Sequence, residues 1–296
     1  MRRMIQTLLA LSLMVAPAAG QTLYAANGGG GVLSTLYILD PTDGAVVSTV
    51  GPIGFSITGL AYDVTSGTLY GSTGNNPASD ARSLVSIDTT TGAGTLIGPS
   101  GVDTPMADLT FDPAGTLYGW SGFSGTRGLY SIDPATGAAT LVGSNTGRLT
   151  FVDGNGLASN VAGEMFGAAT DDSADSAALF SVDPSTAIST MIATLTGMPG
   201  SADASVSALA FNSSGILYGA VQNFSSSLNG FDSFLVTINT STGAVTTLGQ
   251  TFDRLDAIAF VPSGVSPAPS MSLQVLTMLA AMLIAAGVLS VTRRAR

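Results

Sequence analysis

The sequence predicts an all-β fold, a five-bladed β-propeller, because two short motifs alternate along most of the chain. The first motif, of the type LYSIDPATGAATLVG, occurs at 36–51, 84–98, 129–143, 179–193 and 235–249. The second, of the type DLTFDPAGTLYG, occurs at 59–71, 108–119, 156–167 and 208–219. Equivalent tyrosines Tyr70 and Tyr118 lie 118 − 70 = 48 positions apart. Each unit holds four short runs rich in β-branched and aromatic residues, and four strands in that length are typical of one propeller blade.

The two ends of the repeat region predict how the ring closes. The region starts within a unit at Thr22–Ala25 and stops within a unit at Leu255–Val261. The C-terminus should therefore supply the innermost strand of a closing blade whose other three strands come from the N-terminus, which removes two exposed strand edges. The segment 148–153 (RLTFVD) also resembles an opening strand, so the limits of that blade stay open.

Both ends of the chain predict export and anchoring. Arg2 and Arg3 precede an apolar stretch, Leu8–Val15, and then small residues, which is the pattern of a secretory signal peptide. An uncharged apolar run near the C-terminus is long enough to span a bilayer, and the arginines after it should stay cytoplasmic. The expected order is a signal peptide 1–20, a propeller 21–262, a linker with a sorting motif 263–271, a transmembrane helix 272–292 and a basic tail 293–296.

Composition narrows the possible functions. Residues 21–266 hold all nineteen acidic residues but only four arginines, a formal charge of 4 − 19 = −15, which disfavours nucleic acid as a partner. The chain has no Cys, His or Lys, which removes disulfides, His-based triads, His metal sites and Schiff-base chemistry. We therefore expect no catalytic residue, no metal and no cofactor.

Two repeated residue types have structural explanations. An Asp or Asn at the first position of a tight turn accepts hydrogen bonds from the turn backbone, which explains Asp40, Asp88, Asp133, Asp183 and Asn239 better than calcium binding does. An aromatic residue that recurs once per blade is expected between blades, which applies to Tyr24, Tyr70, Tyr118, Phe166 and Tyr218.

The lengths of the connections predict two different faces. Connections after the first and third strands of each unit are short and similar, whereas those after the second and fourth strands are long and unlike one another. Because strands alternate in direction, the long connections should share one face, where recognition loops are usual. The candidate binding residues on this variable face are Phe55, Arg82, Trp120, Phe123, Arg127, Phe224, Phe231 and Arg254.

Two acids are candidates for the mouth of the central channel. Asp108 and Asp256 stand at the start of two predicted innermost strands, and Thr58, Asn155 and Ser207 are expected beside them. Two carboxylates there could hold a cation or raise each other's pKa. With no Lys or His nearby in the sequence, a solvated channel rim is the favoured interpretation.

The repeat resembles that of bacterial extracellular propellers built on LY-x-I-D-P-x-T-G units, over residues 22–261. The segment Pro269-Ser270-Met271-Ser272, followed by an apolar stretch and arginines, resembles C-terminal sorting signals of Gram-negative bacteria that exosortase-type enzymes process, of the IPTL-CTERM or PEP-CTERM kind. This resemblance implies an exported protein, anchored in the inner membrane facing the periplasm, that is displayed at the cell surface or released after processing.

Two functions follow as hypotheses. The first is a non-catalytic exported propeller that binds carbohydrate or protein partners of the cell envelope or extracellular matrix. The alternative is a metal-assisted lyase or hydrolase with its site at the channel mouth. A scaffold without a small ligand is compatible with the same sequence features.

Overall fold

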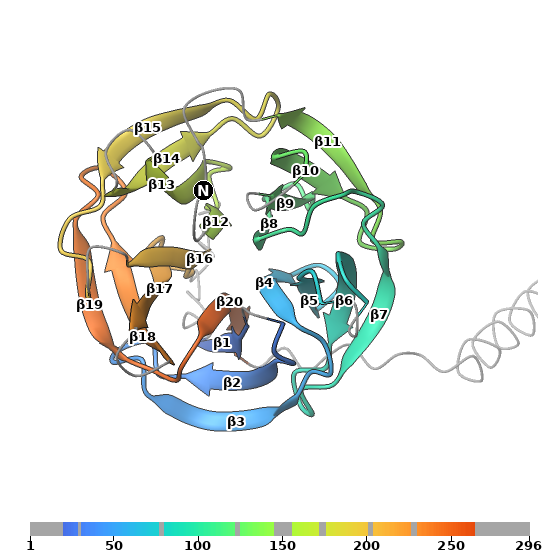
Figure 1. Ribbon diagram of the computed structural model, residues 1–296, viewed down its shortest axis with the longest axis horizontal. Helices are drawn as coiled ribbons and strands as arrows, with labels where there is room; N and C mark the ends of the chain where they lie inside the picture. The colour runs from blue at the N-terminus through green and yellow to red at the C-terminus, as the bar shows by residue number, and fades with distance from the viewer. Residues whose placement is uncertain are drawn as a thin grey trace, which may run out of the picture. The chain divides into compact units, whose positions relative to one another are not determined.

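The protein is an all-β propeller of five four-stranded antiparallel sheets, arranged as blades around a central axis (Figure 1). The computed structural model describes residues 20–28, 31–76, 80–121, 125–144, 156–171, 176–200, 204–225 and 230–263. The predicted signal peptide, sorting motif, transmembrane helix and basic tail lie outside these residues. Within the described segments, no helix has the length and apolar character needed to cross a membrane.

Each blade is one sheet whose first strand in the repeat is innermost. Blade 1 consists of β4 (Ile57–Asp63), β5 (Thr68–Thr73), β6 (Ser83–Ile87) and β7 (Gly94–Pro99). Blade 2 consists of β8 (Asp108–Phe111), β9 (Leu117–Ser121), β10 (Gly128–Ile132) and β11 (Ala139–Ser144). Blade 3 consists of β12 (Gly156–Ser159), β13 (Met165–Asp171), β14 (Ser176–Val182) and β15 (Ser189–Thr194). Blade 4 consists of β16 (Ser205–Phe211), β17 (Leu217–Ser225), β18 (Gly230–Ile238) and β19 (Val245–Gln250).

The closing blade is built from both ends of the repeat region, as predicted. Its order is β20 (Leu255–Pro262), β1 (Gln21–Asn27), β2 (Thr35–Leu39) and β3 (Val46–Pro52). The innermost strand β20 pairs antiparallel with β1, in a register that places Leu23 opposite Phe260. Five blades with this shared closing sheet confirm the fold class expected from the repeat.

The turns after the third strands confirm the interpretation of the repeated aspartates. They span residues 40–45, 88–93, 133–138, 183–188 and 239–244, six residues each. In each turn the first side chain accepts the backbone N–H two residues later, as from Thr42 to Asp40 at 2.8 Å and from Ser241 to Asn239 at 2.9 Å. The side-chain amide oxygen of Asn239 accepts the same hydrogen bond as the carboxylates, so the residues at these positions stabilise the turn.

A glycine-to-glycine contact joins neighbouring blades at these turns. Gly137 of the β10–β11 turn has φ +81°, and a Cβ on it would lie 2.4 Å from the carbonyl oxygen of Gly98 in β7. Likewise, a Cβ on Gly92 would lie 2.6 Å from the carbonyl oxygen of Gly51 in β3. The turn glycines are therefore required for two reasons. They adopt the left-handed conformation, and any side chain on them would collide with the backbone of the neighbouring blade.

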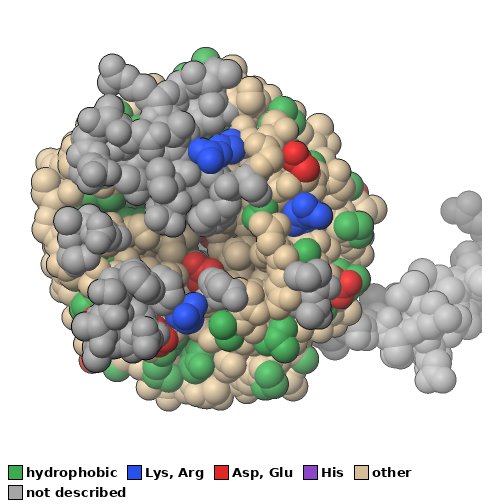
Figure 2. All heavy atoms as spheres, in the orientation of Figure 1, with side chains coloured by type: hydrophobic (Ala, Val, Ile, Leu, Met, Phe, Trp, Pro, Cys, Tyr) green, Lys and Arg blue, Asp and Glu red, His purple; other side chains and the backbone are tan. Residues whose placement is uncertain are grey.

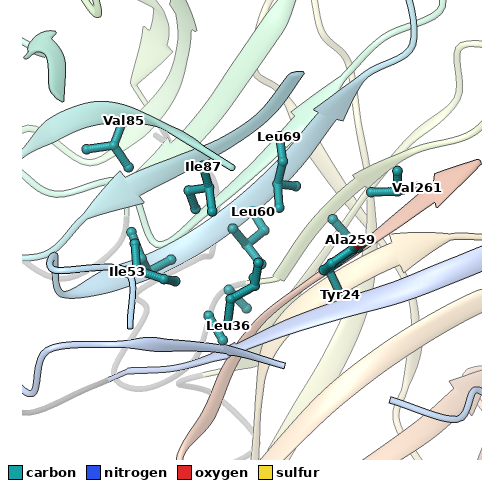
Figure 3. Packing of buried hydrophobic residues seen from close by; sticks show 12 residues of the cluster. Tyr24, Leu36, Ile53, Leu60, Leu69, Val85, Ile87, Ala259 and Val261 are labelled. Carbon is teal, nitrogen blue, oxygen red and sulfur yellow. The ribbon is translucent and has the colours of Figure 1, made fainter. Parts of the chain in front are cut away.

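Aromatic pairs fill the interior between blades. Tyr70 of blade 1 lies 5.7 Å from Phe111 of blade 2, and Tyr218 of blade 4 lies 4.9 Å from Phe260 of the closing blade, centroid to centroid. Figure 3 shows the cluster between the closing blade and blade 1, where Tyr24 and Ala259 face Leu36 and Leu60. The inter-blade core expected for the repeated aromatic residues is confirmed at these positions.

A matched pair of glycine substitutions measures the contact between blades. Gly137→Ala and Gly215→Ala both place an alanine at positive φ, +81° and +76°, but only Gly137 has backbone atoms within 3 Å of the new Cβ. We expect Gly215→Ala to lower the free energy of unfolding by about 1–2 kcal/mol from strain alone. Gly137→Ala should lower the free energy of unfolding by a further ~1–3 kcal/mol, because the new Cβ overpacks against the backbone of Gly98. Urea unfolding checks both values, and equal losses would contradict a tight inter-blade contact.

Candidate binding cavity at the end of the central channel

The turns after the innermost strands are short and fixed by their own first residues. Asp63 accepts the backbone N–H of Thr65 at 2.8 Å, and Asn212 accepts that of Ser214 at 3.0 Å. Asp112 and Asn160 occupy the same position in the other two turns. These four turns leave the end of the central channel uncovered, because each one is only four or five residues long: 64–67, 112–116, 160–164 and 212–216.

An aromatic residue stands at or within two residues of the end of the innermost strand in four of the five blades. The equivalent positions, by their partners in the second strands, are Tyr62, Phe111, Ser159, Phe211 and Phe260. All five are half-buried. The aromatic side chains pack against the inter-blade core on one side and line the end of the channel on the other. Ser159 interrupts this incomplete ring of aromatic residues.

These residues surround a cavity of about 500 Å³ that receives wall residues from all five blades. Its inner wall includes Leu60, Leu109, Leu209 and Ile258, each at most 1% exposed. Its rim includes Val64 and Val161, which are 74% and 84% exposed. Gln21 and Pro262, which are paired where β1 begins and β20 ends, also line it, so the cavity opens on the face with the short turns. We call it the aromatic cavity.

Asp108 closes the channel one residue deeper than this inner wall. Its side chain is fully buried. Oδ1 accepts the N–H of Leu109 at 2.9 Å, and Oδ2 accepts the N–H groups of Leu157 at 2.9 Å and Leu209 at 3.0 Å. One carboxyl group therefore joins the innermost strands of blades 2, 3 and 4 across the axis.

Small residues in the other blades make room for this side chain. The strand registers pair Asp108 with Trp120, and the equivalent pairs place small residues at the same level in the other four innermost strands. These small residues are Gly59, Gly156, Ala208 and Ala257. A Cβ on Gly59 would lie 2.6 Å from the Cα of Asp108, so β4 and β8 approach each other too closely there for a larger residue.

The prediction that Asp108 lies in a solvated channel rim is wrong. Its side chain is buried and accepts hydrogen bonds from backbone N–H groups. Asp256 belongs instead to the layer of Thr58 and Ser207, one residue closer to the variable face, and Asn155 lies outside the described residues. Asp256 Oδ1 accepts the amide of Gln222 at 2.9 Å, and Ser207 donates to the carbonyl of Leu255 at 2.9 Å. The described residues contain no group of three or more acidic side chains placed to hold a metal.

Burial sets the protonation chemistry of Asp108. Loss of hydration raises the pKa of its carboxyl group well above the ordinary value, and the nearby Asp256 charge acts in the same direction. The three backbone N–H donors act against this rise. The net direction is upward, so the native protein holds this proton to higher pH than the unfolded chain does.

Trp120 is not part of an exposed binding face, which corrects the prediction from the sequence. Strand β9 extends through Ser121, and the indole is 2% exposed in the core between blades 2 and 3. Phe55, by contrast, is half-buried in the connection before β4. Phe123 lies outside the described residues. Phe224 and Phe231 are opposite one another in β17 and β18, where the structure describes only the backbone.

The described arginines lie on the variable face. Arg82, Arg127 and Arg254 precede β6, β10 and β20; Arg82 is exposed, and the other two are half-buried. Figure 2 shows these basic side chains around the central hollow of that face. Arg82 Nη1 donates to the carbonyl of Asp103 at 3.2 Å, and Arg254 lies 3.8 Å from the Asp253 carboxylate. The variable face therefore carries the described arginines, while the aromatic cavity opens on the opposite face.

The aromatic cavity was not predicted from the sequence, although a signal for it was present. The residue before the turn Asp or Asn reads Tyr, Phe, Ser and Phe in the second motif. In the sequence this aromatic pattern does not single out a binding site, because the short turns beside it indicate a uniform, structural face.

A pH series tests the buried state of Asp108. Because its pKa is raised by burial, its contribution to stability is greatest below the unfolded-state value and is lost as pH rises through the folded-state value. Asp108→Asn does not titrate, so the stability of the natural protein relative to this variant should fall as pH rises above about 4. The slope can reach about 1.4 kcal/mol per pH unit. Urea unfolding of both proteins from pH 4 to 8 measures it, and parallel curves would mean an ordinary pKa.

Solved structures that resemble this chain support its fold but do not indicate its function. No family model and no curated protein matches the chain. A chain in the crystal structure of a nidogen/laminin complex is similar over 82% of this chain and 98% of its own length, with 12% identity and a TM-score of 0.52. TolB from Acinetobacter baumannii shares 17% identity over 80% of this chain and 54% of its own, with a TM-score of 0.46. At 12% identity the likeness to the chain of the nidogen/laminin complex is one of fold alone.

Proposed function

We propose that the protein is an exported, non-catalytic propeller that binds a carbohydrate or protein partner of the cell envelope or matrix, through a compact group held in the aromatic cavity. The observation that carries this proposal is a cavity of about 500 Å³ lined by all five blades. Concave, mostly apolar cavities of this size with a few polar groups are the usual form of ligand sites.

The depth of the cavity limits what can enter it. Leu60, Leu109, Leu209 and Ile258 lie along its inner wall, and the Asp108 carboxyl group crosses the axis immediately beyond them. A polymer cannot pass through the ring at that level without breaking these hydrogen bonds. The expected ligand is therefore a chain end or a projecting group, and not the middle of a threaded chain.

The binding role is favoured over the alternative lyase or hydrolase by the state of the channel acids. A catalytic carboxylate needs a free oxygen within reach of the substrate. Both oxygens of Asp108 accept backbone hydrogen bonds in a fully buried position. The pair Asp108 and Asp256, on which the enzyme hypothesis depended, therefore offers less to a substrate than the aromatic cavity offers to a ligand.

Export and anchoring belong to the same proposal and rest on the terminal segments of the sequence. The signal-peptide pattern of 1–20 and the apolar run 272–292 support secretion and tethering. The resemblance of Pro269–Ser272 to exosortase-type sorting signals supports processing by such an enzyme. Gly20 and Ser263 are hydrogen-bonded to each other, so the two ends of the described propeller meet next to Gln21 and Pro262, which line the aromatic cavity.

A filling substitution tests whether the aromatic cavity is the binding site. Ser159→Trp adds an indole at a half-exposed position where the other four blades already carry a ring. Ser131→Trp, in strand β10 away from the cavity, is the matched control. We expect the full chain to bind a subset of glycans on a glycan array, or envelope proteins in a direct binding assay. Ser159→Trp should weaken that binding at least about tenfold, and Ser131→Trp should leave it unchanged.

Equal binding by both tryptophan variants would place the site elsewhere on the propeller. Circular dichroism and urea midpoints of the two variants show whether each one is folded before binding is compared.

A further inference from the structure

We propose that the aromatic cavity selects an uncharged, largely apolar group and rejects anions, because two carboxylates stand at its rim and the described residues that line it include no arginine. This inference rests on the proposed function, since it concerns the same cavity. The charged residues among those that line the cavity are Asp63 and Asp112. Every other wall residue is neutral, and most are aliphatic or aromatic.

Asp63, one of the two rim carboxylates, keeps its charge at neutral pH for structural reasons. Burial raises the pKa of Asp63, but hydrogen bonds from Ser66 and Thr65 outweigh it, so its pKa lies below the ordinary value. Asp112 accepts the backbone N–H of Thr116 at 2.8 Å in the same kind of turn. Both carboxylates are therefore held at the rim, where a ligand must pass.

The three arginines that the structure describes are too distant to offset these two charges. Arg254 precedes β20 and Phe260 lies near its other end, six residues later. At about 3.3 Å per residue the separation is ~20 Å, which is about two and a half times the screening length at physiological salt. Arg82 and Arg127 also lie in long connections of the variable face. The propeller thus separates its positive charge from the aromatic cavity.

The wall itself favours an apolar group that fits between rings. Tyr62, Phe111, Phe211 and Phe260 each keep part of the ring exposed toward the cavity. Covering such surface contributes about 25 cal/mol per Å². Ser159 provides the polar interruption, next to Thr110, whose hydroxyl accepts the Ser159 N–H at 3.0 Å. A ligand with one polar substituent on an otherwise apolar body matches this arrangement.

Two dyes with the same aryl skeleton test the charge selection. N-phenyl-1-naphthylamine is neutral, and 8-anilino-1-naphthalenesulfonate carries one negative charge on the equivalent framework. Both fluoresce strongly when they leave water for an apolar cavity. We expect the full chain to bind the neutral dye at least about tenfold more tightly at low salt, and the difference to shrink in 1 M NaCl because salt screens the rim charges.

The decisive variant removes the rim charges without disturbing the turns. Asp63→Asn together with Asp112→Asn reproduces the residues that blades 3 and 4 already have, Asn160 and Asn212. This variant should bind the sulfonate several-fold more tightly and the neutral dye as before. Asp88→Asn together with Asp183→Asn is the matched control, because it changes the net charge equally in turns where Asn239 is also tolerated. It should leave both affinities unchanged.

The outcomes separate this inference from the proposed function. Equal binding of the two dyes, or equal effects of the two double variants, would overturn charge selection while binding in the cavity stands. Binding of neither dye, or binding that Ser159→Trp does not weaken, would overturn ligand binding in the aromatic cavity itself.

Discussion

The structure depends first on the pairing of β1 with β20. This pairing joins residues 21–27 to residues 255–262 and turns a row of similar sheets into a ring. A closed ring brings five innermost strands around one axis, and this arrangement gives the aromatic cavity its wall and Asp108 its two backbone donors from blades 3 and 4. The entropy cost of closing so long a loop grows only logarithmically with its length, whereas every hydrogen bond of the pairing adds to closure.

Much of this architecture could be predicted from the repeat, because turn chemistry and strand composition are local. Asp40 and its equivalents act within their own turns, and neighbouring blades repeat the same motif. Asp108 was misplaced because its role depends on register across blades. A shift of one residue separates the layer of Thr58, Ser207 and Asp256 from the layer of Gly59, Ala208 and Asp108. Trp120 was misplaced for a related reason, since β9 extends into what read as a connection.

Binding sites are usually expected among long, variable loops, but the candidate cavity of this propeller lies on the face with the short turns. Long connections carry the arginines and much of the sequence variety, yet the cavity opens among the short turns. Short turns leave the channel end open, because they do not fold over it. The aromatic residues around the cavity serve two purposes, since one side of each packs in the core while the other faces the opening. A sequence pattern cannot separate these purposes, because both favour the same residue type at the same position.

Asp108 also has a consequence for how such a protein can change over generations. The five blades are alike enough for one to be copied over another, but their axial residues are not interchangeable. Copying blade 2 over blade 3 would bring a second carboxyl group into a space that a single one already fills, beside backbone donors that are already used. Replacing blade 2 with a copy of blade 3 would leave Leu157 and Leu209 without an acceptor for their N–H groups. The ring can therefore tolerate drift in its turns more easily than exchange of its blades, and one residue gives a nearly symmetric molecule a fixed order of parts.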